Sequence, residues 1–212
     1  MKKFDEDLNS LLMRLTAGLN KEAKRKLNVL RNRLIRLNEE NVVKINHSVM
    51  ELVCAKQLIV KGYDVDVEHP VGNGLVCDLY GVKGYGTLIV EVETGFVPPM
   101  HALDPVTYCE ARIASKITRY SDYSDKFGLG IPPYYILQIP QAFTQPPRYR
   151  KSKELKEIKN RCDLYYKNPP VSLEEIKNAR LHTIYIIDVD EVGVKEIDPG
   201  TYMETVVRYR YY

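Results

Sequence analysis

The sequence predicts an α/β (α+β) fold in which a mixed β-sheet is flanked by helices and preceded by a helical arm. Leucines recur at steps of three and four residues between Leu8 and Leu37, which indicates amphipathic helices. Stretches between residues 63 and 93 are rich in β-branched residues and alternate apolar with polar positions, which indicates a meander of strands. With 212 residues, 44% of them hydrophobic, the chain is long enough to bury one substantial core.

The domain organisation follows from this pattern. Residues 1–41 are expected to form a basic, leucine-rich helical arm, and residues 42–212 one domain. Within that domain we expect a core over 42–140 and a helical and β extension over 141–212.

Positive charge is concentrated in the arm. Its first 40 residues contain ten Lys and Arg against six Asp and Glu, while the whole chain contains 31 against 28. The apolar stripe is typical of a helical hairpin or a coiled-coil seam with a solvated basic face. That face, with Lys24, Arg25 and Arg31, also suits contact with phosphates. As a seam, the stripe would join a homodimer, so a chain without the arm is expected to be monomeric.

After the arm, we predict one helix and three strands. A helical apolar pattern runs from Val42 to Lys61 and ends at Gly62, a residue suited to the left-handed position after a helix. The period then changes to two, and turns containing glycine separate the segments. This predicts strands at Tyr63–Glu68, Leu75–Lys83 and Thr87–Glu93.

The rest of the chain alternates helical and β patterns. Asp104 suits an N-cap with Pro105 at the first helical position, so a helix is expected to reach about Tyr123. The further elements expected, in chain order, are a strand at Tyr134–Ile139, an exposed basic helix from Arg148 to Arg161, a helix at Ser172–Arg180, and strands at Thr183–Val189, Val192–Ile197 and Thr205–Tyr211.

Carboxylates interrupt two of the predicted strands. Asp78 lies in the second strand, and Glu91 and Glu93 lie in the third, all within apolar sequence. An acid there costs several kcal/mol unless it is paired, bound to a metal or at the edge of the sheet. Glu91 and Glu93 share one face of their strand, and Asp78 can come opposite Glu91. Such oxygen ligands suit Mg²⁺ or Mn²⁺, although each acid taken singly also fits a solvent-facing strip.

Other acids in this region have structural interpretations. Asp64, Asp66 and Glu68 alternate with valines and are expected to form a solvated edge face. Ser48 and Glu51 fit a capping box, which gives a structural reason for Glu51, and a catalytic role is the alternative.

A helix bearing Glu51, a strand bearing Asp78 and a strand reading Glu91-Val92-Glu93 are followed by a further helix and strand. This order resembles the core of the PD-(D/E)XK nuclease superfamily over the whole predicted core. The resemblance implies a restriction-endonuclease-like αβββαβ fold in which Asp78 and Glu91 bind Mg²⁺, Glu51 joins them, and the Val92 carbonyl is a further ligand. The chain is also similar to a nuclease-like protein of archaeal spindle-shaped viruses.

The sequence departs from the family at Glu93, where the family usually has a lysine that positions water and offsets phosphate charge. Glu93 is then a further metal ligand, or a lysine from elsewhere replaces it, or the protein binds without cleaving. The following helix offers Lys116, which shares a helical face with Tyr120, as in superfamily members whose second helix carries a polar residue and a tyrosine. A solvated surface lysine is the alternative.

Further basic residues are candidates for nucleic-acid contact. Arg112, Arg119 and Tyr120 lie on the helix of Lys116, and Arg150 and Lys153 lie in the later basic run. Alternatively, Arg112 and Arg119 are simply exposed to solvent. The basic run is expected to be a helix that flanks the same nucleic acid.

The resemblance implies a DNA endonuclease that depends on Mg²⁺ or Mn²⁺ and hydrolyses phosphodiester bonds. By analogy with Holliday-junction resolvases, four-way junctions are the first-choice substrate and a homodimer is the first-choice assembly. Two alternatives stay open. One is a catalytically inactive DNA-binding protein that retains the nuclease fold, and the other is a helical interaction module on a β scaffold.

The sequence also excludes several other classes of protein. No apolar run reaches about 18 residues, and the start turns acidic at Asp5, so neither a membrane span nor a signal peptide is expected. We therefore expect an intracellular protein, in the host cytoplasm if a virus encodes it. The absence of Trp and the abundance of Lys, Glu and Ile favour a thermophilic host. No P-loop or GxSxG motif is present.

Cysteines and histidines show no metal-binding spacing. The cysteines are expected to be core thiols, with a disulfide as the alternative, and the histidines to be structural or exposed. These residues are Cys54, Cys77, Cys109, Cys162, His47, His69, His101 and His182.

Overall fold

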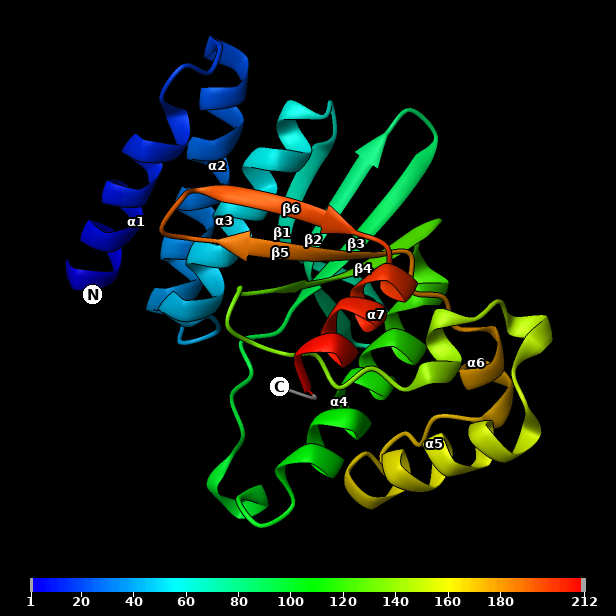
Figure 1. Ribbon diagram of the computed structural model, residues 1–212. Coiled ribbons are helices and arrows are strands. Elements are labelled where there is room, and N and C mark those ends of the chain that lie inside the picture. The colour runs from blue at the N-terminus through cyan, green and yellow to red at the C-terminus, as the bar shows by residue number, and fades with distance from the viewer. Residues whose placement is uncertain (1, 211–212) are drawn as a thin grey trace.

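The computed structural model describes residues 2–210, and within them the strands form one mixed sheet between two groups of helices (Figure 1). The helices are α1 (Lys2–Thr16), α2 (Lys21–Glu39), α3 (Ile45–Val60), α4 (Pro105–Tyr120), α5 (Ser152–Tyr165), α6 (Leu173–Asn178) and α7 (Pro199–Arg210). The strands are β1 (Asp64–Gly72), β2 (Leu75–Lys83), β3 (Gly86–Val92), β4 (Lys126–Ile131), β5 (Thr183–Asp188) and β6 (Gly193–Ile197).

The sheet follows the order of the chain from β1 to β6. Strands β1, β2 and β3 form the predicted antiparallel meander, β3, β4 and β5 run parallel, and β6 returns antiparallel to β5. The mixed α/β class is therefore confirmed. Over α3, β1, β2, β3, α4 and β4 the chain has the predicted αβββαβ order of elements.

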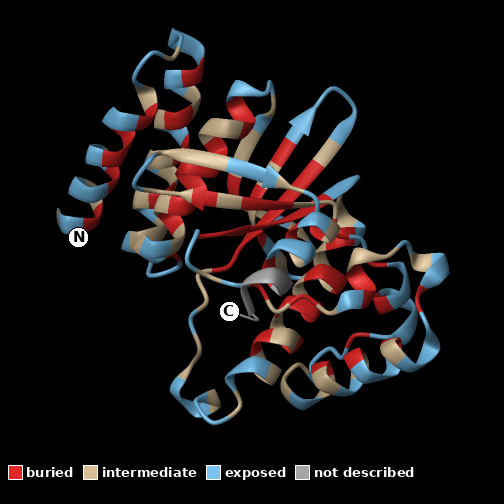
Figure 2. Ribbon diagram, in the orientation of Figure 1, coloured by how far each residue is buried: buried red, intermediate tan, exposed pale blue. Residues whose placement is uncertain are grey.

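Each face of the sheet is covered by its own hydrophobic core (Figure 2). One core joins α1, α2 and α3 to the face that carries Leu79, Val90 and Val92. The other joins α4, α5, α6 and α7 to the face that carries Ile89 and Phe127. Neighbouring residues of β3 point to opposite faces, so acids at alternate positions near its end share the α4 face with Ile89.

The arm folds onto the rest of the chain. Helices α1 and α2 break at Gly18, and the Asn20 side chain caps α2 by accepting from the Ala23 N–H. Leu8, Leu27 and Leu34 are fully buried, and both helices contact α3. The leucine stripe was expected to form either a helical hairpin or a coiled-coil seam, and the structure shows the hairpin. It is covered by the chain's own α3 and is not an open dimerisation seam.

Truncation of one of these leucines is expected to destabilise the whole domain. Leu27→Ala should lower the free energy of unfolding by about 2 to 5 kcal/mol, since it leaves a cavity in a core shared with α3. Chemical denaturation followed by circular dichroism measures this, with the exposed Val29→Ala on the same helix as the matched control. An unchanged unfolding midpoint for Leu27→Ala would show that the arm is energetically separate.

The fourth strand lies earlier than predicted. We expected a strand at Tyr134–Ile139, but the strand is β4, and Tyr134–Ile139 is irregular. The sequence did not predict β4 because the strand contains two glycines, which are more typical of turns. Both are needed for close approach, because a Cβ on Gly128 would lie 2.5 Å from the Tyr185 ring and one on Gly130 would lie 2.7 Å from Ile187. Leu137 is buried without belonging to a strand.

The C-terminal segment is helical where a strand was predicted. Helix α7 covers the expected strand up to Arg210, and Tyr211 lies outside the described residues. Asp198 starts the helix by accepting from the N–H groups of Gly200 and Thr201, and Pro199 occupies the first position. The cap outweighs the strand preference of the valines and tyrosines that follow it.

All four cysteines are buried and free, as expected for core thiols. Between residues 2 and 210, no helix has both the length and the hydropathy of a membrane span.

Candidate metal centre and active site

Strands β2 and β3 separate at Asp78. The ladder between them pairs Leu79 with Val90 and continues only toward the hairpin turn. Beyond Leu79, side chains replace the ladder bonds: the Asp78 N–H donates to the Glu91 carboxylate at 3.0 Å, and the Val92 N–H donates to the Asp78 carboxylate. The two predicted acids are therefore brought together at the point where the sheet opens.

Lys116 reaches this opening from α4. Its Nζ lies 3.0 Å from a carboxylate oxygen of Glu91, 3.0 Å from one of Glu93 and 3.9 Å from one of Asp78. It also donates to the Val92 carbonyl at 3.3 Å. Burial lowers the pKa of Lys116, but the surrounding carboxylates outweigh it and raise the pKa well above that of free lysine. Lys116 is therefore a charged member of the cluster and not the solvated surface lysine of the alternative.

Glu93 has both carboxylate oxygens occupied by cations. One oxygen pairs with Lys116, and the other lies 3.1 Å from the Arg112 guanidinium. Its side chain is 5% exposed. Arg112 also donates to the Phe96 carbonyl. Glu93 therefore holds Lys116 and Arg112 in place, and each of its two oxygens is paired with a cationic side chain.

Glu51 is buried without a partner. Its side chain is fully inaccessible, and neither carboxylate oxygen has a hydrogen-bond partner. The capping-box interpretation is wrong, because α3 begins at Ile45 and Ser48 lies inside the helix. Burial, and then the negative charge of Asp78, raise the pKa of Glu51 well above its ordinary value. A buried carboxyl in this state calls for a proton or a cation.

His47 lies one helical turn before Glu51 and faces the same cluster. A ring nitrogen of His47 and carboxylate oxygens of Glu51 and Asp78 all lie within 4.8 Å of one another. The structure therefore adds His47, which was expected to be structural or exposed, to the candidate ligands. The spacing of four residues between His47 and Glu51 was the available signal, because it places two ligands on one helix face. One nitrogen and two oxygen donors, with unpartnered Glu51 oxygens, fit a divalent cation.

Glu68, which was predicted to lie on a solvated face, is only partly exposed, and the charge of Asp78 acts on it. It adopts a positive φ of 47° between the ladder pairs of Val67 and His69. Burial, and then the charge of Asp78, raise the pKa of Glu68 to about 7. The other two acids of the strip are paired with α2: Asp64 with Lys26, and Asp66 with Arg33.

The cluster contains more acids than bases. Glu91 is 2% exposed, and its burial, followed by the charge of Asp78, raises its pKa to about 8, although Lys116 opposes the shift. The carboxyl groups outnumber the basic side chains beside them, even with Arg33, which donates to the Glu68 carbonyl, added to the two bases named next. The acids are Glu51, Glu68, Asp78, Glu91 and Glu93, and the bases are Lys116 and Arg112. The described residues therefore leave room for added positive charge.

The predicted nucleic-acid contacts divide into surface and internal residues. Lys24, Arg25 and Lys153 are exposed, and Arg31 is partly exposed. Arg150 was predicted to contact nucleic acid, but it is buried. It is 8% exposed, and its guanidinium donates to the backbone carbonyls of residues 145, 176 and 177. Its role is to fasten the α5–α6 region.

The two remaining candidates on α4 are partly buried and make internal hydrogen bonds. Arg119 donates to the Pro169 carbonyl, and the Tyr120 hydroxyl donates to the Val76 carbonyl at 2.9 Å. Tyr120 therefore anchors β2 close to the opening, on the helix face that also carries Lys116.

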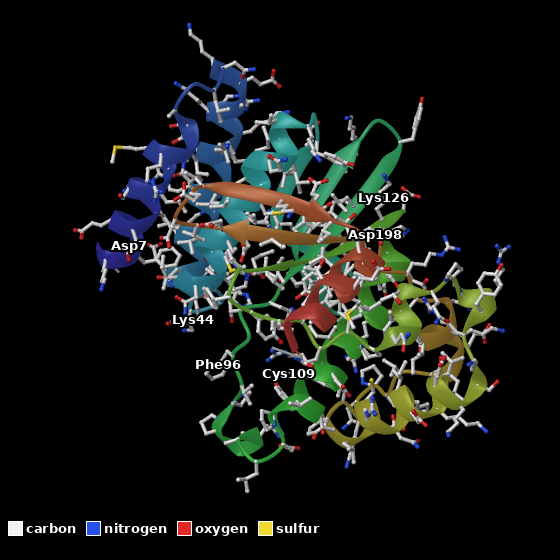
Figure 3. All side chains as sticks on the ribbon, in the orientation of Figure 1. Asp7, Lys44, Phe96, Cys109, Lys126 and Asp198 are labelled. Atoms are coloured by element: carbon white, nitrogen blue, oxygen red, sulfur yellow. The ribbon has the colours of Figure 1, made fainter. Side chains whose placement is uncertain are left out.

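A loop leaves β3 immediately after Glu93. Gly95 has a φ of 82°, and a Cβ there would lie 2.5 Å from the Tyr135 ring, so only glycine fits without displacement. Phe96 follows, and its side chain extends away from the body of the molecule, 66% exposed (Figure 3). The loop thus places an exposed aromatic ring three residues from the acidic cluster.

Comparisons of the chain with protein-family models, with curated proteins and with solved structures found no match.

Proposed function

We propose that this protein is a metal-dependent nuclease of the PD-(D/E)XK type that hydrolyses phosphodiester bonds in DNA. The observation that carries the proposal is the position of Lys116, which lies between Glu91 and Glu93 and close to Asp78. The family's usual lysine position is occupied by Glu93 here, and α4 brings a lysine to the same cluster. This arrangement supports a lysine supplied from elsewhere over Glu93 as a metal ligand and over binding without cleavage.

Asp78, Glu91 and the unpartnered Glu51 would hold a divalent cation, Mg²⁺ or Mn²⁺. The Val92 carbonyl, which faces Lys116, would be a further ligand. When bound, such an ion supplies Lewis-acid stabilisation of a phosphate and makes it easier to deprotonate the attacking water.

The chain's own residues have separate tasks in this proposal. Lys116 offsets the negative charge that builds on the phosphate and orients water by donating from its ammonium group. Glu93 positions Lys116, and Arg112 holds the second oxygen of Glu93. The exposed Lys24, Arg25 and Lys153 would contact the DNA backbone, which predicts salt-dependent binding.

Branched DNA and a homodimer are further parts of the proposal. A two-fold pair of sites would allow incision of both strands of a four-way junction. Because the leucine stripe of the arm is covered by α3, such a dimer would use another surface.

The test is cleavage of end-labelled four-way junction, duplex and single-stranded DNA with Mg²⁺ or Mn²⁺, up to thermophilic temperatures. Glu91→Gln, prepared identically, is the control for contaminating nucleases. We expect cleavage by the wild-type protein alone. If neither protein cleaves but both shift DNA in gels, the proposal is wrong and the inactive DNA-binding alternative is supported. If neither cleaves nor binds, the helical interaction module is supported.

Glu93→Gln distinguishes a positioning residue from a metal ligand. We expect Mn²⁺ affinity in calorimetry to change less than about threefold, because both Glu93 oxygens already pair with cations. The cleavage rate should fall by about tenfold or more, since Lys116 loses one of its charged partners. Glu93→Asp, which retains the charge, should recover part of this loss. A large decrease in Mn²⁺ affinity would instead make Glu93 a ligand.

A further inference from the structure

We propose that His47, Glu51 and Asp78 form a cation site whose imidazole ligand selects a first-row transition-metal dication such as Mn²⁺ over Mg²⁺. The site lies in the acidic cluster of the proposed nuclease and specifies which metal that cluster takes. The inference rests on the proposed function only for its biological purpose, because cation binding is measurable without DNA.

The backbone places these ligands together. His47 and Glu51 lie one turn apart on α3, on one face of the sheet, and Asp78 lies where β2 separates from β3. The separation matters because it frees the Asp78 side chain from the regular alternation of the strand. Donor atoms of the three residues lie within 4.8 Å of one another. Two ligands on consecutive turns of one helix and a third on a strand form a small, partly rigid site.

Glu51 supplies the independent evidence that a ligand belongs here. It is fully buried, and both its carboxylate oxygens are without a hydrogen-bond partner. Nearly all buried polar side chains in folded proteins have a partner, so an orphan pair of oxygens points to an ion or a proton. Asp78, in contrast, already accepts from the Val92 N–H, and Glu91 is engaged by the Asp78 N–H and Lys116.

The donor types argue for the class of metal. Mg²⁺ prefers oxygen ligands and retains much of its water shell, whereas imidazole nitrogen is a good ligand for the first-row transition metals. Mn²⁺ accepts both carboxylate and imidazole ligands, and it is a paramagnetic probe. With His47 replaced by an oxygen ligand, the same site would become an all-oxygen site that suits Mg²⁺.

The experiment uses the full chain, freed of metal with a chelator and then titrated with MnCl₂ or MgCl₂ in a calorimeter. Pulsed electron paramagnetic resonance on the stoichiometric Mn²⁺ sample detects whether a ¹⁴N nucleus is coupled to the ion. We expect ¹⁴N coupling in the wild-type protein and at least tenfold tighter binding of Mn²⁺ than of Mg²⁺.

Three variants assign the nitrogen. His47→Gln should lose the ¹⁴N signal and at least about tenfold in Mn²⁺ affinity. His47→Asp should narrow the preference for Mn²⁺ over Mg²⁺ by at least about tenfold, because it restores an oxygen ligand. His101→Gln is the matched control, since His101 stacks on Tyr108 outside the cluster, and it should behave as the wild type.

Several results would overturn the inference. These are stoichiometric Mn²⁺ binding without ¹⁴N coupling, a ¹⁴N signal that survives in His47→Gln, or equal affinities for Mn²⁺ and Mg²⁺ in the wild type. The wild-type spectrum decides the matter even if a variant fails to fold. A nitrogen-coupled Mn²⁺ site in a protein that does not cleave DNA would retain this inference and reject the nuclease, so the two failures are distinguishable.

Discussion

Lys116→Met is expected to reduce the rate of DNA cleavage by at least about 100-fold while leaving DNA affinity within about threefold. The ammonium group is the only part removed, because methionine retains an unbranched apolar stem that packs beside α4. Glu91 and Glu93 then lose the cation that lies 3.0 Å from each of them. The phosphate loses a charge-neutralising donor in the transition state, whereas the exposed basic residues that bind DNA are unchanged.

Single-turnover cleavage and gel-shift titration, performed on the same preparations, separate the two effects. Lys61→Met is the matched control: Lys61 is partly exposed, pairs with Glu196 at the far end of α3, and should have no influence on the rate. An unaltered rate for Lys116→Met would reject the displaced-lysine mechanism. A parallel loss of affinity and rate would make Lys116 a DNA-binding residue.

The second large effect is on stability. Without metal, the free energy of unfolding is expected to decrease by about 2 kcal/mol between pH 6.5 and pH 8.5. Burial and neighbouring acids raise the pKa of Glu68 to about 7 and of Glu91 to about 8, and raise that of Glu51 as well. The ordinary glutamate value is 4.5, so the folded chain holds protons that the unfolded chain has released. The stabilisation that these protonated groups provide is fully present below pH 4.5, and it is lost as the pH rises through their pKa values in the folded chain.

The window is chosen to exclude other groups. Burial lowers the pKa of His182 from 6.5, so His182 changes stability only below the window. Burial raises the pKa of the Cys54, Cys77 and Cys162 thiols, which would contribute above the window because free cysteine titrates near 9. Urea unfolding in the presence of a chelator at several pH values measures the slope. Glu91→Gln, which cannot titrate at position 91, should reduce the slope, and added Mn²⁺ at pH 8.5 should restore stability. A flat wild-type profile would mean that these acids are ionised already.

Most of the fold could be predicted because local patterns and tertiary packing agree. The meander of β1, β2 and β3 combines alternation with glycine turns, and α4 begins at Pro105 as expected. The prediction failed where packing overrides local preference. In β4, glycines that usually mark turns instead make room for Tyr185 and Ile187, and in α7 the Asp198 cap dominates a β-rich sequence.

The site was predictable only in part, for a related reason. Asp78, Glu91 and Glu93 are visible as acids within apolar strands, and Lys116 as a lysine on the following helix. His47 and Glu68 are not visible in this way. Glu68 has a positive φ inside β1, which no pattern of alternation predicts, and His47 meets Asp78 through the packing of α3 on the sheet. The four-residue spacing places His47 beside Glu51 on one helix face, but the meeting of that face with Asp78 depends on three-dimensional packing.

The separation of β2 and β3 makes one amide a reporter of the site. The Val92 N–H, which a regular ladder would direct to a carbonyl, donates instead to the Asp78 carboxylate. Its proton resonance therefore senses the charge on that carboxylate and the arrival of any ion beside it. Diamagnetic Mg²⁺ titrated into ¹⁵N-labelled protein would shift the Val92 peak. Occupancy of the site could then be followed from this peak in the absence of any substrate.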